Sequence, residues 1–273
     1  MPRRVAVKIC GVTDPGDALL SAELGADFLG LNFWPGSPRF VGAERAGEIA
    51  AAVRAAAPRV ALVGVFVNPD AAFVAEMTAA VGLDLVQFSG DETDAAVRPF
   101  AARAIKALRT HDLAAVAPFA DCWGLLLDAP RTGRSPGSPG FGAAGRVTHS
   151  GGSPAAFAAD PGVEAPRFQD YGGTGRQWDY GAAVPILGGG NGSAGTAGEL
   201  GAAGALGSTA GGRRRVFLAG GLRPENVRRV VATLRPFAVD VCSGVESAPG
   251  RKEPRLLRQL FEEIRNGQVD PST

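Results

Sequence analysis

Short apolar runs rich in β-branched residues alternate with alanine-rich helical stretches eight times along the chain. We expect strands at residues 5–10, 27–33, 60–67, 83–88, 104–108, 123–127, 215–218 and 239–241. Eight strand-then-helix steps predict a parallel sheet with helical crossovers, and near-continuously apolar strands fit a sheet covered on both faces or closed on itself. The count of eight favours a single (β/α)₈ TIM barrel, of the α/β class, over a doubly wound open sheet.

The stretches between the strands carry helix signals. Asp14-Pro15 is a capping residue followed by proline, which predicts a helix from there to Leu24. Further helices are expected at residues 45–56, 93–101 and 112–119, among others, and a closing helix at 253–266.

Two stretches break this rhythm. Residues 131–171 are rich in Pro, Gly, Ser and Ala and have no period of 2 or 3.6, and residues 188–212 contain 11 glycines in 25 positions. Neither stretch can bury enough apolar area to offset the entropy of being ordered. We therefore expect one domain over residues 1–273, with flexible insertions at about 131–171 and 188–212.

Composition excludes several classes of partner. The net charge of +1 gives no general attraction to nucleic acid or to an anionic membrane, and no apolar run approaches the roughly 20 residues that span a bilayer. The three cysteines are widely spaced and only two histidines are present, so neither a disulfide framework nor a metal site is supported. The run after Met1-Pro2-Arg3-Arg4 is too short for a signal-peptide core, which predicts a cytoplasmic protein.

Two reactive side chains stand where a buried strand gives way to a loop. Cys10 closes the run at residues 5–9 and is followed by Gly11, and Asp128 closes the run at residues 125–127. In a parallel barrel this is the rim where catalytic residues lie. A thiol and a carboxyl group there can divide a proton-transfer reaction between them, so both are candidate catalytic residues.

Three glycine motifs predict a phosphate site. Gly172-Gly173-Thr174-Gly175 follows the first insertion, and Gly220-Gly221 and Ser243-Gly244 follow the seventh and eighth strands. Glycine lets the backbone approach an anion closely, and the loops after strands seven and eight are the usual phosphate site in these barrels. The candidate phosphate-binding residues are Gly173, Gly220, Gly221, Ser243 and Gly244.

Three further polar residues are candidates for binding a substrate. Arg39, in the loop after the second strand, could hold a carboxylate with two parallel hydrogen bonds from its planar guanidinium group. Gln87 ends the fourth strand and could orient a polar substrate or cap the next helix. Asp240 lies within the eighth strand and needs partners, because an unpaired buried charge is costly; it could bind sugar hydroxyls or accept from backbone amides.

Taken in order, these motifs resemble the phosphoribosylanthranilate isomerase family of tryptophan biosynthesis. The resemblance spans residues 5 to about 265 and is interrupted only by the two insertions. It is carried by Lys8-Ile9-Cys10-Gly11, Ser37-Pro38-Arg39-Phe40, residues 64–68, residues 86–92, Leu127-Asp128, residues 172–175, residues 218–222 and residues 239–246.

The resemblance implies an Amadori rearrangement of N-(5-phosphoribosyl)anthranilate, a small phosphosugar, without metal or organic cofactor, in a monomer or homodimer. Asp128 would be the general acid that opens the sugar ring, and Cys10 the general base that takes the C2 proton. Arg39 would hold the anthranilate carboxylate and Asp240 would contact the sugar. A free thiol is only a few per cent thiolate at pH 7, so Cys10 needs a lowered pKa for this role.

The chain departs from the family pattern at two of the matched positions. Ser89 stands where the family usually has His, and Cys242 where a second Ser is common. Two alternatives remain open. One is a histidine-pathway isomerase on the same barrel, which uses two carboxylates and has Asp in place of Cys10; the other is a non-catalytic phosphate-binding barrel whose insertions form an interaction surface.

Overall fold

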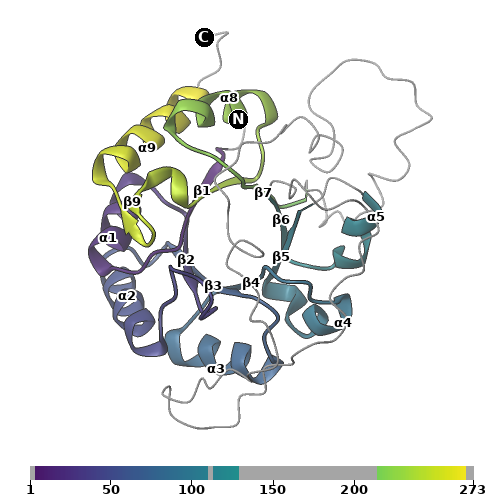
Figure 1. Cartoon of the computed structure of the whole chain (residues 1–273). Coiled ribbons are helices and arrows are strands. Elements are labelled where there is room, and N and C mark those ends of the chain that lie inside the picture. The colour runs from purple at the N-terminus through teal and green to yellow at the C-terminus, as the bar shows by residue number, and fades with distance from the viewer. Residues whose placement is uncertain (1–3, 110–112, 129–213, 269–273) are drawn as a thin grey trace, which may run out of the picture.

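The computed structural model describes residues 4–109, 113–128 and 214–268, and in this part of the chain eight parallel strands close into a barrel (Figure 1). Each strand pairs with the next along the chain, and the last pairs with the first. The strands are β1 (Ala6–Cys10), β2 (Phe28–Asn32), β3 (Ala61–Phe66), β4 (Leu85–Phe88), β5 (Ala104–Leu108), β6 (Gly124–Leu127), β7 (Val216–Leu218) and β8 (Ala238–Val241). The predicted (β/α)₈ barrel is therefore confirmed.

Helices surround the ring of strands, as Figure 1 shows in a view along the barrel. They are α1 (Pro15–Leu24), α2 (Ala43–Ala56), α3 (Ala71–Val81), α4 (Asp94–Val97), α5 (Leu113–Val116), α8 (Pro224–Leu234) and α9 (Pro254–Gln268). The predicted cap of α1 is present, because the Asp14 carboxylate accepts hydrogen bonds from the backbone N–H groups of Gly16 and Asp17.

Two expected helices are shorter than predicted. The stretch at 93–101 forms one turn of α4 and then a 3₁₀ segment, η1 (Arg98–Arg103), and the stretch at 112–119 forms α5 and then η2 (Ala117–Phe119). Pro99 and Pro118 lie at the start of these 3₁₀ segments. Proline has no N–H to donate to the preceding turn, which ends the α-helical ladder there.

The barrel interior and the layer between strands and helices form two separate apolar cores. The inner core consists of Phe28, Val63, Leu85, Ile105, Leu126, Phe217, Ala219 and Ala238. Phe28, Trp123, Phe217 and Phe237 pack against one another there, with ring centroids 5.3–6.3 Å apart. Phe28 begins β2 and Trp123 precedes β6, so these rings fill the end of the barrel at which the strands begin.

A small hairpin follows β8. The 3₁₀ segment η4 (Ser243–Val245) leads into β9 (Glu246–Ala248), which pairs with β10 (Arg251–Lys252). The tight turn between them includes Gly250, with φ +81°. The hairpin returns Lys252 to the ends of β1 and β8, where its Nζ donates a hydrogen bond to the Cys10 carbonyl at 2.6 Å.

Candidate active site

Four of the predicted site residues point their side chains to the same face of the sheet as the inner-core residues, that is, into the barrel. Successive side chains of a strand point to opposite faces, so residues two or four positions beyond an inner-core residue also point inward. Gln87 follows Leu85, Asp128 follows Leu126, Asp240 follows Ala238, and Cys10 follows Ala6, which packs against the inner core. The Asp128 N–H donates to the Leu108 carbonyl at 2.9 Å and so continues the β5–β6 ladder by one residue. All four residues therefore lie toward the end of the barrel at which the strands finish.

Lys8 supplies the partner that the buried Asp240 requires. Its Nζ lies 2.9 Å from Asp240 Oδ1, and no part of the Lys8 side chain is exposed. Burial alone would lower the pKa of Lys8, but the charges of Asp240 and Cys10 outweigh it and raise that pKa above its ordinary value. A protonated lysine is thus fixed inside the barrel two residues before Cys10.

Cys10 has the electrostatic surroundings of a base. A hydrogen bond from the Cys242 thiol is the largest influence and lowers the Cys10 pKa, burial opposes it, and the charge of Lys8 lowers it further; the result falls from 9.0 to about 7. The same contact and burial raise the pKa of Cys242 well above the ordinary thiol value. The proton therefore stays on Cys242, and at pH 7 about half of Cys10 is thiolate.

Arg39 lies beside this pair and is held by Glu246. Its Nε donates to Glu246 Oε1 at 2.9 Å and its Nη2 to Oε2 at 2.7 Å, and Lys252 Nζ donates to Oε1 at 2.8 Å. All three side chains are less than a tenth exposed. Burial raises the pKa of Glu246, but the hydrogen bonds and charges of its two cationic partners lower it below its ordinary value. The arrangement fixes the direction of the Arg39 guanidinium.

Gln87 presents an acceptor to the barrel interior. Its Nε2 donates to Ser89 Oγ at 3.0 Å, whereas its Oε1 is buried and has no hydrogen-bond partner among the described residues. A buried acceptor without a partner costs about 1–3 kcal/mol, so such an atom is well suited to a hydroxyl donor that arrives with a ligand. Ser89 thus occupies the space next to Gln87 and orients its amide.

The two loops that carry the described phosphate candidates, Gly220-Gly221 and Ser243-Gly244, lie against each other. Gly220 and Gly221 have φ of +90° and +69°, which a residue with a side chain rarely adopts. A Cβ on Gly244 would collide with the Leu222 carbonyl, so the loops after β7 and β8 touch at that point. Ser243 is exposed next to this contact. The remaining candidate, Gly173, lies outside the described residues.

Four residues of this cluster received no site role from the sequence, namely Lys8, Cys242, Glu246 and Lys252. Lys8 shares the inward parity of Cys10, which is a usable signal, and Glu246 belongs to the motif after β8. Nothing in the local sequence marks Lys252, because its approach to Cys10 depends on the unpredicted hairpin. Among the described residues, no three His, Cys, Asp or Glu side chains are grouped as metal ligands are, and no described helix is long and apolar enough to cross a membrane.

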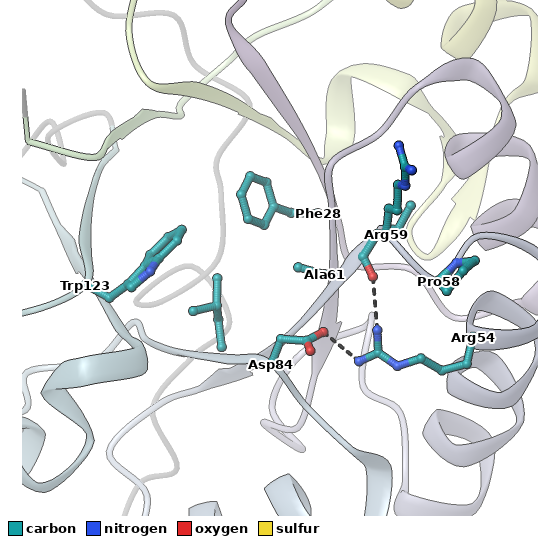
Figure 2. Close-up of a pocket in the computed structure, with 9 residues that line it drawn as sticks. Phe28, Arg54, Pro58, Arg59, Ala61, Asp84 and Trp123 are labelled. Carbon is teal, nitrogen blue, oxygen red and sulfur yellow. Dashed lines mark hydrogen bonds and ion pairs between the residues drawn. The ribbon is translucent and has the colours of Figure 1, made fainter. Parts of the chain in front are cut away.

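A hollow of about 240 Å³ lies at the other end of the barrel (Figure 2). Figure 2 shows Phe28 and Trp123 on its inner side, and Arg54 paired with Asp84 on its outer side, where Arg54 Nη2 lies 2.6 Å from Asp84 Oδ2. Its wall includes Ala61 and Leu85, each the first residue of a strand. It is therefore separated from Cys10 by the length of the strands and is no part of the candidate site.

Comparison with known proteins gives one consistent result. The family model described as N-(5'-phosphoribosyl)anthranilate (PRA) isomerase matches residues 7–139 and 171–263. The N-(5'-phosphoribosyl)anthranilate isomerase of Citrifermentans bemidjiense is 36% identical over 261 residues, which cover 95% of this chain and 96% of the relative.

Solved structures agree. The phosphoribosyl anthranilate isomerase of Thermus thermophilus is 30% identical with a TM-score of 0.64, over 96% of this chain and 98% of that one. Another phosphoribosyl anthranilate isomerase, solved in complex with reduced 1-(o-carboxyphenylamino)-1-deoxyribulose 5-phosphate, is 27% identical with a TM-score of 0.65 over the same shares.

Proposed function

The chain belongs to the N-(5'-phosphoribosyl)anthranilate isomerase family, and we propose that Cys10 and Asp128 carry out the two proton transfers of that family's reaction. The enzyme is an isomerase of tryptophan biosynthesis. It converts N-(5-phospho-β-D-ribosyl)anthranilate to 1-(2-carboxyphenylamino)-1-deoxy-D-ribulose 5-phosphate by an Amadori rearrangement. The observation that supports the assignment most strongly is that Cys10 ends β1 and Asp128 directly follows β6, at the same end of the barrel and on the inward-facing side of each strand.

Asp128 acts first, as the general acid. It gives a proton to the furanose ring oxygen, the bond from that oxygen to C1 breaks, and the nitrogen lone pair forms a Schiff base. The Cys10 thiolate then takes the C2 proton, which leaves an enolamine that rearranges to the ketone. The lowered pKa of Cys10 suits this step, because a base works best when its pKa is near the working pH.

The remaining candidates hold the two ends of the substrate. The touching loops at Gly220-Gly221 and Ser243-Gly244 would bind the phosphate, and Gly173 is proposed to join them. Arg39, aimed by Glu246, would bind the anthranilate carboxylate. The ribose hydroxyls would donate hydrogen bonds to Gln87 Oε1, the buried acceptor with no partner among the described residues, and contact Asp240.

The proposal extends to the setting of the enzyme. We place it in the cytosol as a monomer or homodimer. Its three cysteines are all unpaired, which is the usual state of cysteines in a reducing compartment.

Loss of phosphoribosylanthranilate fluorescence on adding the purified enzyme measures turnover directly. Cys10→Ala and Asp128→Asn should each lower the rate by at least about 10²–10⁴, the usual contribution of one proton transfer, while circular dichroism stays that of the wild type. Cys122→Ser is the matched control, since burial raises the pKa of Cys122 to about 11 and it lies outside the site. A folded Cys10→Ala enzyme with wild-type turnover would overturn the assignment.

A further inference from the structure

Cys10 and Cys242 are neighbours across the seam where the barrel closes. In the register of β1 and β8, Lys8 is opposite Asp240 and Ile9 is opposite Val241, and Cys10 and Cys242 are the residues that come next on the two segments. The ion pair between Lys8 and Asp240 shows that side chains of this parity meet across the two strands. The two thiols therefore project from adjacent strand ends toward the same interior.

The space around both sulfur atoms is kept open by glycine. A Cβ on Gly30 would lie 2.7 Å from Cys10 Sγ, and a Cβ on Gly11 would lie 3.0 Å from Cys242 Sγ. Adjacent strands are about 4.8 Å apart, which is within the Cα separation of about 4.4–6.8 Å that a disulfide can bridge. Each thiol is the largest influence on the pKa of the other, and Cys242 Sγ also lies 3.8 Å from Glu246 Oε1.

Lys252 ties the two strand ends together. Its Nζ donates to the Cys10 carbonyl at 2.6 Å and lies 3.4 Å from the Cys242 carbonyl. Because the lysine side chain has no exposed surface and also pairs with Glu246, this clamp restrains the backbone on both sides of the thiol pair. The clamp thus holds the two strand ends side by side.

The two thiols differ in the way that a reactive and a resolving cysteine differ. Cys10 has the lower pKa, about 7, and lies near the charge of Lys8, whereas Cys242 retains its proton. Both are partly exposed. Peroxides react with thiolates that are accessible, and the sulfenic acid so formed condenses with a neighbouring thiol.

We propose that Cys10 and Cys242 form a peroxide-sensitive modification site, at which oxidation of Cys10 is followed by a reversible disulfide to Cys242. In the first step the Cys10 thiolate attacks a peroxide oxygen, the O–O bond breaks, and with one proton the products are Cys10 sulfenic acid and an alcohol or water. In the second step Cys242 sulfur displaces that hydroxyl as water. In total two thiols and one peroxide give a disulfide, one water and one alcohol or water.

The disulfide removes the base proposed above, so the claim about activity rests on the proposed function. The disulfide also protects Cys10 from the irreversible sulfinic acid. An accessible disulfide is reduced by a dithiol through thiol–disulfide exchange, so dithiothreitol should restore the enzyme.

The experiment treats the purified full chain with hydrogen peroxide and follows intact mass, the disulfide-linked peptide and turnover, before and after dithiothreitol. The wild type should lose two hydrogens in mass, yield a peptide pair joining Cys10 to Cys242, lose turnover, and regain both mass and turnover with dithiothreitol. In Cys242→Ser, excess peroxide should carry Cys10 past the sulfenic acid to the sulfinic acid and so add two oxygen atoms, and turnover, relative to its own untreated enzyme, should not return with dithiothreitol. Cys122→Ser should behave as the wild type.

Either of two results would overturn the proposal: the wild type gains oxygen without losing two hydrogens, or Cys242→Ser recovers with dithiothreitol as fully as the wild type. The mass measurement needs no substrate. It therefore decides the disulfide even where untreated enzyme shows no turnover, a result that would count against the proposed function alone.

Discussion

Replacing Cys242 by alanine removes the hydrogen bond that most lowers the pKa of Cys10. The pKa of Cys10 should therefore rise from about 7 toward or past the ordinary 9.0, because burial and the charge of Asp240 stay in place and raise it while Lys8 continues to lower it. Two pKa units correspond to about 2.7 kcal/mol. A rise of two units would reduce the thiolate share at pH 7 from about half to about one per cent, so kcat/KM at pH 7 would fall about 50-fold.

The pH profile of kcat/KM separates this effect from damage to the fold. A base must be unprotonated to act, so the rate rises with pH through the pKa of Cys10. For Cys242→Ala the acidic limb should move upward from about 7, and the difference from the wild type should shrink as both enzymes approach pH 9.

Cys242→Ser is the matched variant, because its hydroxyl keeps a donor in place. Its acidic limb should stay close to that of the wild type. If Cys242→Ala has the wild-type limb, or loses the same factor at every pH, the hydrogen bond does not set the pKa of Cys10 and the reasoning is refuted.

Two further predictions concern the groups around the thiols. Glu246→Gln should lower the free energy of unfolding by about 3–5 kcal/mol, because it leaves Arg39 and Lys252 buried without their anion; an unchanged urea midpoint would contradict this. The pKa of Glu246 is lowered from 4.5, so the ionised carboxylate adds to the free energy of unfolding above about pH 4.5, and this stabilisation is lost as pH falls below that value. The free energy of unfolding of the wild type should therefore fall with acid more steeply than that of the variant. Gly244→Ala should push the loop off the Leu222 carbonyl, weaken inhibition by inorganic phosphate and raise KM while leaving the acidic limb of kcat/KM in place; unaltered phosphate inhibition would remove Gly244 from the site.

The positions of Cys10 and Asp128 could be predicted because they depend on local pattern. A strand that is apolar throughout ends where its periodicity ends, and parallel strands of a barrel all finish at one end. The inward parity of both residues then follows from alternation along β1 and β6, and the structure agrees with that placement.

The partner of Cys10 could not be predicted in the same way. Cys10 and Cys242 are 232 positions apart, and their contact depends on the register with which β8 pairs with β1. A shift of one residue would turn every side chain of a strand to the other face, and no local signal fixes that register. The position of Lys252 is harder still to predict, because its side chain reaches the Cys10 carbonyl only through the hairpin of β9 and β10.

The lowered pKa that suits Cys10 to its proposed role as a base also makes it a target for oxidation. At a pKa near 7 about half of the thiol is ionised at neutral pH. A larger thiolate share would speed the proton transfer and the reaction with peroxide alike. Serine at position 242 would supply a donor without a second sulfur, so it would preserve the base but leave its sulfenic acid unresolved. Cysteine there supplies both the donor and the resolving thiol. The two functions of Cys242 therefore separate in a single substitution, because Cys242→Ser should keep the pH profile and lose the reversibility.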